Sequence, residues 1–480
     1  MHSDEEAQRM REFAAKLDFD IDEDVAREAL DAAEPLRESV DTLRDDYDLE
    51  TDSIGEFADD EYGALLDVYP EPRTEGQGPL DGISLAIKDV VAAKNLRMTL
   101  GLEDYSYVPS FDSSVVDRLL KAGGTLVGKA NTDALAIGPS GEFSEIKEVI
   151  NPAAEDRVPG GSSSGPAAAV AGGLVDASIG TDTGGSIRIP AACCGVVGMR
   201  PTHGLVPRYG LYELAPSADT IGPLARDVET AAKVLEAIVG HDPKDPTSSY
   251  ARLGPLADRL DARDSFDIGL PTSFFDNTAD EVSDVVRGLA ARLADVDSVE
   301  IHELDLEMGE ITNAHPLLSS PEFSWLQRQS LTVRGQGTQY NPEFRAALQE
   351  ISYNDHIALR KLPSAYIDDR SDGESYLLGR REEIRFKEHL LERFETVDLL
   401  LTPTLRAVPP KRGLTGATHE GIIRMTGNTG PISRVGFPVI SVPAGEHDGI
   451  PVGAQLIAPG REDLTVLQGA KLVEDITNTT

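Results

Sequence analysis

The chain of 480 residues carries 83 acidic and 44 basic side chains, which gives a formal net charge of −39 at pH 7. So acidic a protein gains no counter-ion release from DNA, RNA or anionic lipid, and we therefore expect no nucleic acid or membrane among its partners. Lysine accounts for 12 of the basic residues, and dense carboxylates with scarce lysine predict a protein adapted to concentrated salt, which screens self-repulsion.

The first 60 residues are the most acidic part of the chain, with 22 acidic and 6 basic side chains. Apolar residues recur there at helical spacing, which predicts an acidic extension of amphipathic helices over residues 1–60, followed by one main domain over residues 61–480. The polar N-terminus carries no secretory signal, and no apolar stretch approaches the roughly 18 residues of a membrane helix. We therefore expect a cytoplasmic protein.

A strand pattern follows in residues 78–91, GPLDGISLAIKDVV. Ile83, Leu85 and Ile87 alternate with small or polar residues at period two, and Lys88 comes directly after them. A lysine at the end of an apolar strand is more often a solvent-facing edge residue than a buried one. The residue pattern alone therefore favours a structural role for Lys88.

Two glycine–serine clusters lie close together, GGSSSG at residues 160–165 and GGS at residues 184–186. Such clusters are often flexible linkers. Here Pro166 and the small residues after it predict a helix with proline in its first turn, and residues 175–180 predict a short buried strand. Ser186 opens a further helix-like run that Pro190 interrupts. Turns between strands and helices direct backbone N–H groups at one point, as an oxyanion site requires.

The two cysteines, Cys193 and Cys194, are adjacent and lie in an apolar segment. A vicinal pair has no metal-ligand spacing and defines no disulfide framework. Buried core residues are the expected role for them, and a cysteine nucleophile is a remote alternative.

The remaining segments alternate between helix and strand patterns. A capping box, Thr278 with Glu281, predicts the start of a helix that runs to about residue 295. Residues 305–376 have weaker periodicity and contain Trp325. The other expected elements are helices from residue 114, over 226–239 and over 377–394, and strands over 125–128, 267–270, 398–402, 439–442 and 452–457.

The motifs around the glycine–serine clusters resemble the amidase signature family, which are serine hydrolases with a Ser-Ser-Lys triad. The family's two active serines are 24 positions apart, as Ser162 and Ser186 are here. Ser164 and Pro166 depart from the usual residues beside the triad. The matching stretches are GPLDGI and KD in residues 78–89, GGSSSG, GTDTGGSIRIPAACCGVVGMRPT at 180–202, GLVPRYG at 204–210, VGFPVISVPAG and GIPVGAQLIA.

This resemblance reverses the interpretation of the lysine and implies a mechanism. Lys88 is then the neutral base, Ser162 the bridging serine and Ser186 the nucleophile that becomes an acyl-ester. A lysine base near pH 7 needs a pKa about 3 units below its ordinary value, which burial can supply. Asp182 and Arg188 are expected to hold the loop. The oxyanion hole is expected at the backbone N–H groups of Thr183, Gly184, Gly185 and Ser186.

The family also implies an α/β fold with a central mixed, twisted sheet flanked by helices on both faces. The expected function is hydrolysis of a small-molecule carboxylic amide to an acid and ammonia or amine, without cofactor or metal, in a possible homodimer. The substrate itself is not predictable, because the pocket walls are expected from residues 305–430.

Three alternatives remain beside a free-standing amidase. The GSSSG at residues 161–165 fits the nucleophile elbow of an α/β-hydrolase, although the polar segment before it does not fit the required strand. A second alternative is the A subunit of a glutamine-dependent aminoacyl-tRNA amidotransferase. There an aspartate helps to hold glutamine, and Thr426 stands at the corresponding position in this chain. A non-catalytic scaffold is disfavoured because all three triad positions are intact.

Overall fold

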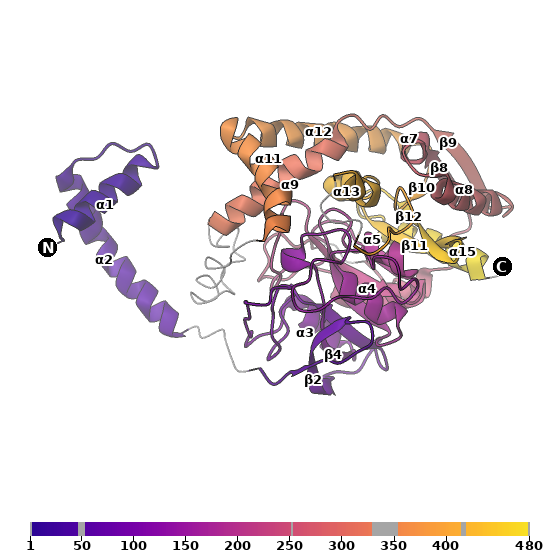
Figure 1. The fold of residues 1–480 in the computed structure, drawn as a ribbon, viewed down its shortest axis with the longest axis horizontal. Coiled ribbons are helices and arrows are strands. Elements are labelled where there is room, and N and C mark those ends of the chain that lie inside the picture. Colours follow the sequence, from indigo (N-terminus) through magenta and orange to yellow (C-terminus); the bar gives the residue numbers. More distant parts are fainter. Residues whose placement is uncertain (1, 47–52, 251–252, 329–353, 414–418, 479–480) are drawn as a thin grey trace. The chain divides into compact units, whose positions relative to one another are not determined.

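The computed structural model of the chain describes residues 2–46, 53–250, 253–328, 354–413 and 419–478. The chain divides into two compact units, Met1–Glu50 and Thr51–Thr480 (Figure 1). The second unit contains the sheet and both glycine–serine clusters.

The first unit is a pair of helices, α1 (Asp4–Ala15) and α2 (Glu23–Asp46). Ser3 caps α1 in a reciprocal capping box with Glu6, and Arg27 bonds to the main chain of His2. Alanine side chains of the two helices are buried, whereas several larger apolar side chains that the helical spacing had singled out are exposed. The exposed ones are Phe13, Leu17, Val25, Leu36 and Val40.

A mixed sheet forms the centre of the second unit, which confirms the predicted fold class. Within the described residues it has twelve strands in the order β1-β2-β4-β3-β5-β7-β6-β11-β12-β10-β8-β9. The pairs β3–β4, β3–β5, β8–β10 and β8–β9 are parallel and the others are antiparallel. The strands are β1 (Glu56–Phe57), β2 (Leu65–Arg73), β3 (Ser84–Lys88), β4 (Thr125–Ala130), β5 (Ala177–Asp182), β6 (Val197–Arg200), β7 (Thr220–Ala225), β8 (Phe266–Pro271), β9 (Val299–Leu304), β10 (Leu399–Pro403), β11 (Val439–His447) and β12 (Ile450–Ile457).

Two groups of helices flank the sheet, and the helices within each group pack against one another. One group is α4 (Ser164–Ala171) and α5 (Arg188–Cys194). The other is α3 (Ser114–Lys121), α6 (Val228–Ile238), α8 (Asp280–Ala294) and α15 (Asp463–Asn478). Short side chains line the sheet beside the first group and let α4 and α5 approach the strands closely. This close approach brings the two glycine–serine turns together.

A third group of helices, α9 (Ile311–Arg328), α11 (Asp355–Arg370) and α12 (Glu374–Arg393), packs together (Figure 1). Helices α9 and α12 of this group also contact α14 (Gly430–Val435). The segment 305–376, whose hydrophobic periodicity is weak, forms α9 and α11 in part. Its residues 329–353 lie outside the described residues. The other elements are α7 (Thr272–Asp276), α13 (His419–Thr426) and the short 3-10 helices Ala134–Ala136 and Ala257–Arg259. In the described parts of the chain, no helix is long and apolar enough to cross a membrane.

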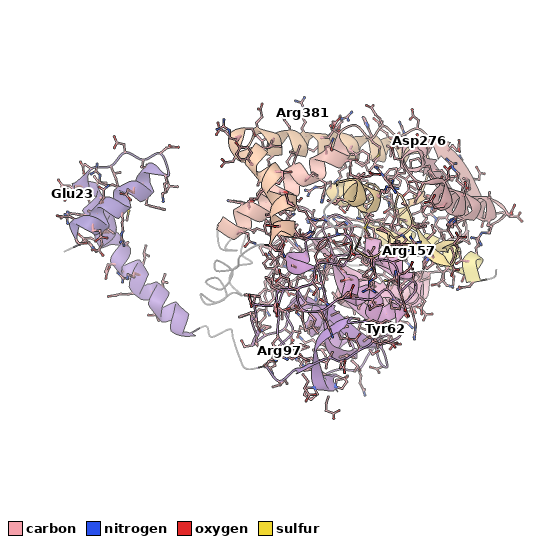
Figure 2. All side chains as sticks on the ribbon, in the orientation of Figure 1. Glu23, Tyr62, Arg97, Arg157, Asp276 and Arg381 are labelled. Carbon is pink, nitrogen blue, oxygen red and sulfur yellow. The ribbon has the colours of Figure 1, made fainter. Side chains whose placement is uncertain are left out.

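The boundary between the two units falls earlier than the predicted residue 60. Glu56 and Phe57 pair with β2 as a short edge strand and so belong to the sheet. Arg97, labelled in Figure 2, lies over the ring of Phe57 at 4.1 Å and forms an ion pair with Asp67 on β2. Residues 56 and 57, which the prediction placed in the acidic extension, thus pair with the edge of β2 that would otherwise be open.

Two local predictions were wrong in detail. Helix α8 begins after Ala279 without a side-chain cap, because the hydroxyl of Thr278 donates instead to the carbonyl of Phe274. Pro190 does not interrupt α5, because it lies in the first turn, where its missing N–H has no helical partner to lose.

Candidate functional site

Lys88 ends β3 and is fully buried. Its Nζ donates to the Oγ of Ser162 at 2.8 Å and to the Oγ1 of Thr181, on the neighbouring strand β5, at 2.9 Å. Because β3 lies between β4 and β5, both sides of the lysine are covered by strands. The solvent-facing position that the alternation by itself favoured is therefore not the one observed.

Burial lowers the pKa of Lys88 to about 7, since removing the ammonium from water disfavours the charged form. The carboxylates of Asp133, Asp182 and Asp219 act in the opposite direction but do not restore the ordinary value. Near neutral pH a large fraction of Lys88 is therefore unprotonated and able to accept a proton.

Ser162 lies in the first glycine–serine turn, after a cis peptide bond from Gly161. Its carbonyl accepts hydrogen bonds from the Thr132 hydroxyl at 2.9 Å and from the Asp133 N–H at 3.3 Å. The Asp133 carboxylate in turn accepts two backbone N–H groups from the following loop. The segment 131–133 thus holds the backbone that carries the Ser162 hydroxyl.

The second turn, between β5 and α5, carries Ser186. The Ser186 carbonyl accepts from the N–H of Ser163 at 3.2 Å, which places the two turns side by side. Ser186 is half-buried and lines a cavity, and in the described structure its hydroxyl makes no hydrogen bond to Ser162. Catalytic hydrogen bonds are often longer without substrate, so this geometry is compatible with a proton relay.

Of the four backbone N–H groups predicted for an oxyanion hole, one is already occupied. The N–H of Gly185 donates to Asp182 Oδ1 at 2.9 Å. The N–H groups of Thr183, Gly184 and Ser186 have no acceptor among the described residues. The turn requires glycine at 185, where φ is +128° and a Cβ would lie 2.2 Å from the hydroxyl of Thr429.

Asp182 holds this turn in place through two buried arginines. Arg188 Nε lies 3.0 Å and Arg200 Nη1 lies 3.3 Å from the carboxylate. Although burial acts to raise the pKa of Asp182, the two guanidinium groups hold it well below its ordinary value. Asp182 and Arg188 therefore have the structural position that the sequence led us to expect.

We expect Asp182→Asn to destabilise the protein by about 3–5 kcal/mol, because it leaves two buried guanidinium groups without a counter-charge. Denaturant unfolding of the variant measures this loss. The exposed pair of Asp117 and Lys121 supplies the control, since Asp117→Ala should cost less than about 1 kcal/mol. Equal losses in both variants would contradict the structural role of Asp182.

A cavity of about 390 Å³ opens in front of Ser186, Thr183 and Gly184. Its walls come from the loop at residues 136–139 and from α9, α11, α13 and α14, which agrees with the prediction that residues 305–430 shape the pocket. Sequence analysis did not single out the lining side chains His315, Arg360 and Lys361. No local pattern could have identified them, because their helices are far from the motifs in the sequence.

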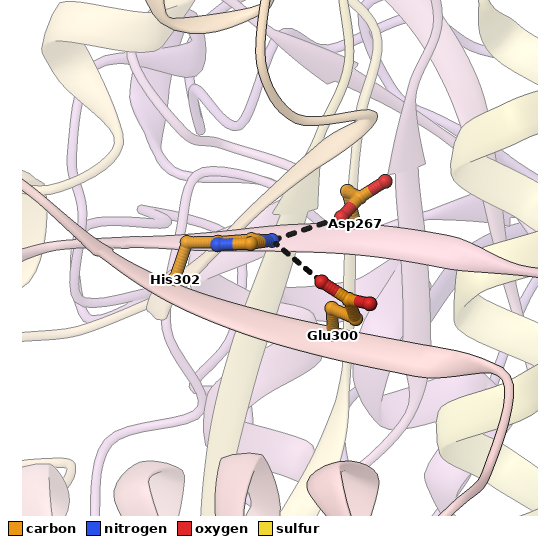
Figure 3. A group of neighbouring side chains, drawn as sticks. All are labelled: Asp267, Glu300 and His302. Atoms are coloured by element: carbon orange, nitrogen blue, oxygen red, sulfur yellow. Dashed lines mark hydrogen bonds and ion pairs between the residues drawn. The ribbon is translucent and has the colours of Figure 1, made fainter.

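Three side chains outside this cavity have metal-ligand chemistry. Asp267 on β8 and Glu300 and His302 on β9 hold their ligand atoms within 4.8 Å of one another (Figure 3). His302 Nε2 lies 2.8 Å from Asp267 and 3.9 Å from Glu300. Because this hydrogen bond and ion pair account for their proximity on an exposed sheet edge, we assign no metal to them.

Comparison with known proteins gives the family. The model of the family described as Amidase matches residues 46–467. The chain belongs to the amidase signature family. Because family and fold agree, it is an enzyme with amidohydrolase-type catalysis.

Three relatives illustrate the range of this family. The A subunit of the glutamyl-tRNA(Gln) amidotransferase of Natronomonas pharaonis is 37% identical over 83% of this chain and 96% of its own. The structure of the corresponding protein from Thermotoga maritima has a TM-score of 0.73 and 30% identity, over 85% of this chain and 86% of its own. The structure of 6-aminohexanoate cyclic dimer hydrolase has a TM-score of 0.72 and 27% identity, over 83% of this chain and 85% of its own.

These relatives correct one expectation from the sequence. The net charge led us to exclude nucleic acid and to expect a small-molecule amide as the sole ligand of the enzyme. Relatives at 30–37% identity are, by name, subunits of an enzyme that acts on a tRNA. The exclusion fails because net charge averages over the whole surface, whereas one member of an assembly can take part in tRNA chemistry through its partners.

Proposed function

We propose that the chain hydrolyses carboxylic amides through an acyl-enzyme on Ser186, with Lys88 as the base and Ser162 between them. The observation that carries the proposal is the buried Lys88 ammonium, whose pKa of about 7 suits a base, hydrogen-bonded to Ser162 at 2.8 Å. Lysines on an acidic surface have raised pKa values and cannot fill this role at neutral pH.

In the first step Ser186 Oγ bonds to the amide carbonyl carbon while its proton passes through Ser162 Oγ to Lys88 Nζ. The negative charge on the carbonyl oxygen is held by the N–H groups of Thr183, Gly184 and Ser186. The C–N bond then breaks as Lys88 returns the proton, again through Ser162, to the leaving nitrogen. Ammonia or an amine departs and an ester remains on Ser186.

In the second step water attacks the ester carbonyl and gives a proton to Lys88 through Ser162. The C–O bond to Ser186 breaks, the serine recovers a proton, and the carboxylic acid leaves. No redox change occurs, and the net reaction is amide plus water to acid plus ammonia or amine. The chemistry needs a neutral lysine at the start of each step.

This requirement predicts the pH dependence. We expect kcat/KM for a neutral amide to rise as pH increases through about 7, because Lys88 must be unprotonated, and to level off above roughly pH 8. Ammonia release between pH 5 and pH 9 measures the profile, and thermal unfolding over the same range controls for loss of folded protein. A profile that falls with rising pH would contradict Lys88 as the base.

The comparisons favour one setting for this chemistry, the A subunit of an aminoacyl-tRNA amidotransferase, because relatives spanning most of the chain carry that name. A specific observation supports a free-standing amidase as the second candidate. Thr426 lines the cavity, and the sequence resemblance places it where such A subunits have an aspartate that helps to hold glutamine. Glutaminase activity that appears after adding partner subunits and charged tRNA would support the first setting, and amidase activity of the isolated chain would support the second.

The acidic composition supports a separate proposal, that the fold depends on concentrated salt. We expect the free energy of unfolding to increase from low to molar salt, because a net charge of −39 repels itself least when screened. Urea unfolding at a series of KCl concentrations measures the effect, and a stability indifferent to salt would remove the proposal.

A further inference from the structure

The side chains that line the catalytic cavity are unbalanced in charge. Lys361 and Arg360 on α11 both line it, and no aspartate or glutamate does so among the described residues. In a chain of net charge −39, a cavity with two cations and no carboxylate is unexpected from composition. The imbalance concerns the reaction directly, because Ser186 lines the same cavity.

The two cations have no counter-ion of their own. Lys361 is buried over the ring of Phe323 at 5.5 Å and has neither a hydrogen bond nor an ion pair among the described residues. Arg360 donates from Nε to His356 at 3.2 Å, while its two terminal nitrogens have no partner in the same set. Burying a cation without a counter-charge is costly, so this arrangement is suited to an anion supplied by a ligand.

The nearby carboxylates are already satisfied by the protein. The ones whose charge acts on Lys88 or Lys361 are Asp133, Asp182, Asp219 and Glu322. Asp133 accepts two backbone N–H groups, and Asp182 accepts two arginines. Asp219 accepts the Thr183 hydroxyl and two N–H groups, and Glu322 accepts two hydroxyls and an N–H. None of the four lines the cavity, and each already accepts two or more hydrogen bonds from the protein.

The uncharged lining adds donors to the same cavity. Ser320 is buried, and its hydroxyl has no hydrogen-bond partner among the described residues. His315, whose ring lies against Gly184, also has a buried Nδ1 without a partner in that set. Burial lowers the pKa of His315 well below its ordinary value, so the imidazole adds no charge at neutral pH. Burial also lowers the pKa of Lys361, to about 8, so at pH 7 most of Lys361 keeps its proton. At that pH the cavity therefore offers positive charge and a free hydroxyl.

We propose that the cavity selects amides that carry a carboxylate and no ammonium group, and that Lys361 is the residue that pairs with that carboxylate. Monoamides of dicarboxylic acids have this chemistry. The inference rests on the proposed amide hydrolysis at Ser186. It follows the free-standing amidase, the second candidate above, and not a subunit that uses glutamine, because the ammonium group of glutamine would face Lys361 and Arg360 without an acceptor.

Three amides with the same five-carbon chain test the proposal on the full-length protein. Glutaramate carries the carboxylate alone, pentanamide carries no charge, and glutamine carries the carboxylate with an ammonium group. We expect kcat/KM, measured as ammonia release, to be roughly 10- to 100-fold higher for glutaramate than for the other two. Equal values for glutaramate and pentanamide, or a higher value for glutamine, would overturn the proposal.

Variants of Lys361 identify the anchor. Lys361→Met should lose roughly 10- to 100-fold in kcat/KM for glutaramate, mostly through KM, and should change kcat/KM for pentanamide by a much smaller factor. Lys361→Arg should retain most of the preference. Lys387→Met is the matched control, because Lys387 also lies over a phenylalanine ring, at 5.4 Å, but outside this cavity. A loss in Lys361→Met that is equal for glutaramate and pentanamide would contradict the pairing.

Failure of the proposed function has a different signature. If the wild-type protein releases ammonia from none of the three amides, amide hydrolysis by the isolated chain is refuted. Calorimetry on the Ser186→Ala variant then tests the selectivity through the affinity for each amide, and glutaramate should bind more tightly than pentanamide and glutamine. Binding that does not distinguish them would overturn the selectivity as well.

Discussion

Ser186→Ala is expected to lower kcat for amide hydrolysis by about 10⁵-fold or more, because it removes the atom that forms the acyl bond. Replacing one member of a nucleophile–base unit costs nearly as much as replacing all of them. Single-turnover ammonia release measures the residual rate. Mass spectrometry of the enzyme mixed with a slow ester substrate should show an acyl adduct on the wild type and none on the variant.

Ser164→Ala is the matched control for this experiment. Ser164 lies in the neighbouring turn, is buried, and has a hydroxyl without a hydrogen-bond partner among the described residues. The variant should keep wild-type turnover to within a few-fold, since no step of the reaction involves it. Wild-type rates in a folded Ser186→Ala protein would refute the acyl-enzyme.

Lys88→Met has the second large expected effect, and it acts on activity and stability in opposite directions. Activity should fall by about 10⁴-fold or more at every pH, because no other group accepts the proton from Ser162. The free energy of unfolding at pH 7 should rise by about 2 kcal/mol. At pH 7, burial of a lysine whose pKa is lowered from 10.5 to about 7 costs the wild type roughly 4 kcal/mol. The two hydrogen bonds of Lys88, which the variant lacks, stabilise the wild type by about 1 kcal/mol each and so reduce the gain.

The sign of this stability change follows from proton binding. Between pH 7 and pH 10.5 the unfolded chain holds a proton on Lys88 that the folded protein does not, so the wild type becomes more stable as pH rises. The advantage of the methionine variant should therefore shrink as pH approaches 10.5. Urea unfolding at pH 7, 8 and 9 measures this trend.

Lys129 supplies the contrast. It is also fully buried, on the adjacent strand β4, but it lies 3.6 Å from the buried carboxylate of Asp89. Lys129→Met should destabilise the protein by about 3–5 kcal/mol, because Asp89 is left without its counter-charge. If Lys88→Met destabilises the protein as much as Lys129→Met does, Lys88 is a structural ion and not a base.

Several features were predictable because they depend on local pattern. The period-two alternation of residues 83–87 located β3, and proline after GGSSSG located the start of α4. The cap of α6 at Asp227 follows from residue type at a helix start, and its side chain accepts the Thr230 N–H. Where a local pattern competes with a tertiary partner, the partner prevails, as with Thr278 and Phe274.

The sequence by itself determined the family, the mixed α/β fold and the positions at which two hydroxyls and a lysine could meet, because those depend on residue types at fixed spacing. The tertiary structure decided that Lys88 loses its solvent, because desolvation comes from strands β4 and β5 on either side of it. It also decided that Lys361 and Arg360 line the cavity, since α11 lies far along the chain from Ser186. The pKa of Lys88 and the lining of the cavity both depend on side chains that are distant in the sequence and exclude water from the site. Local sequence patterns do not show which distant side chains these are.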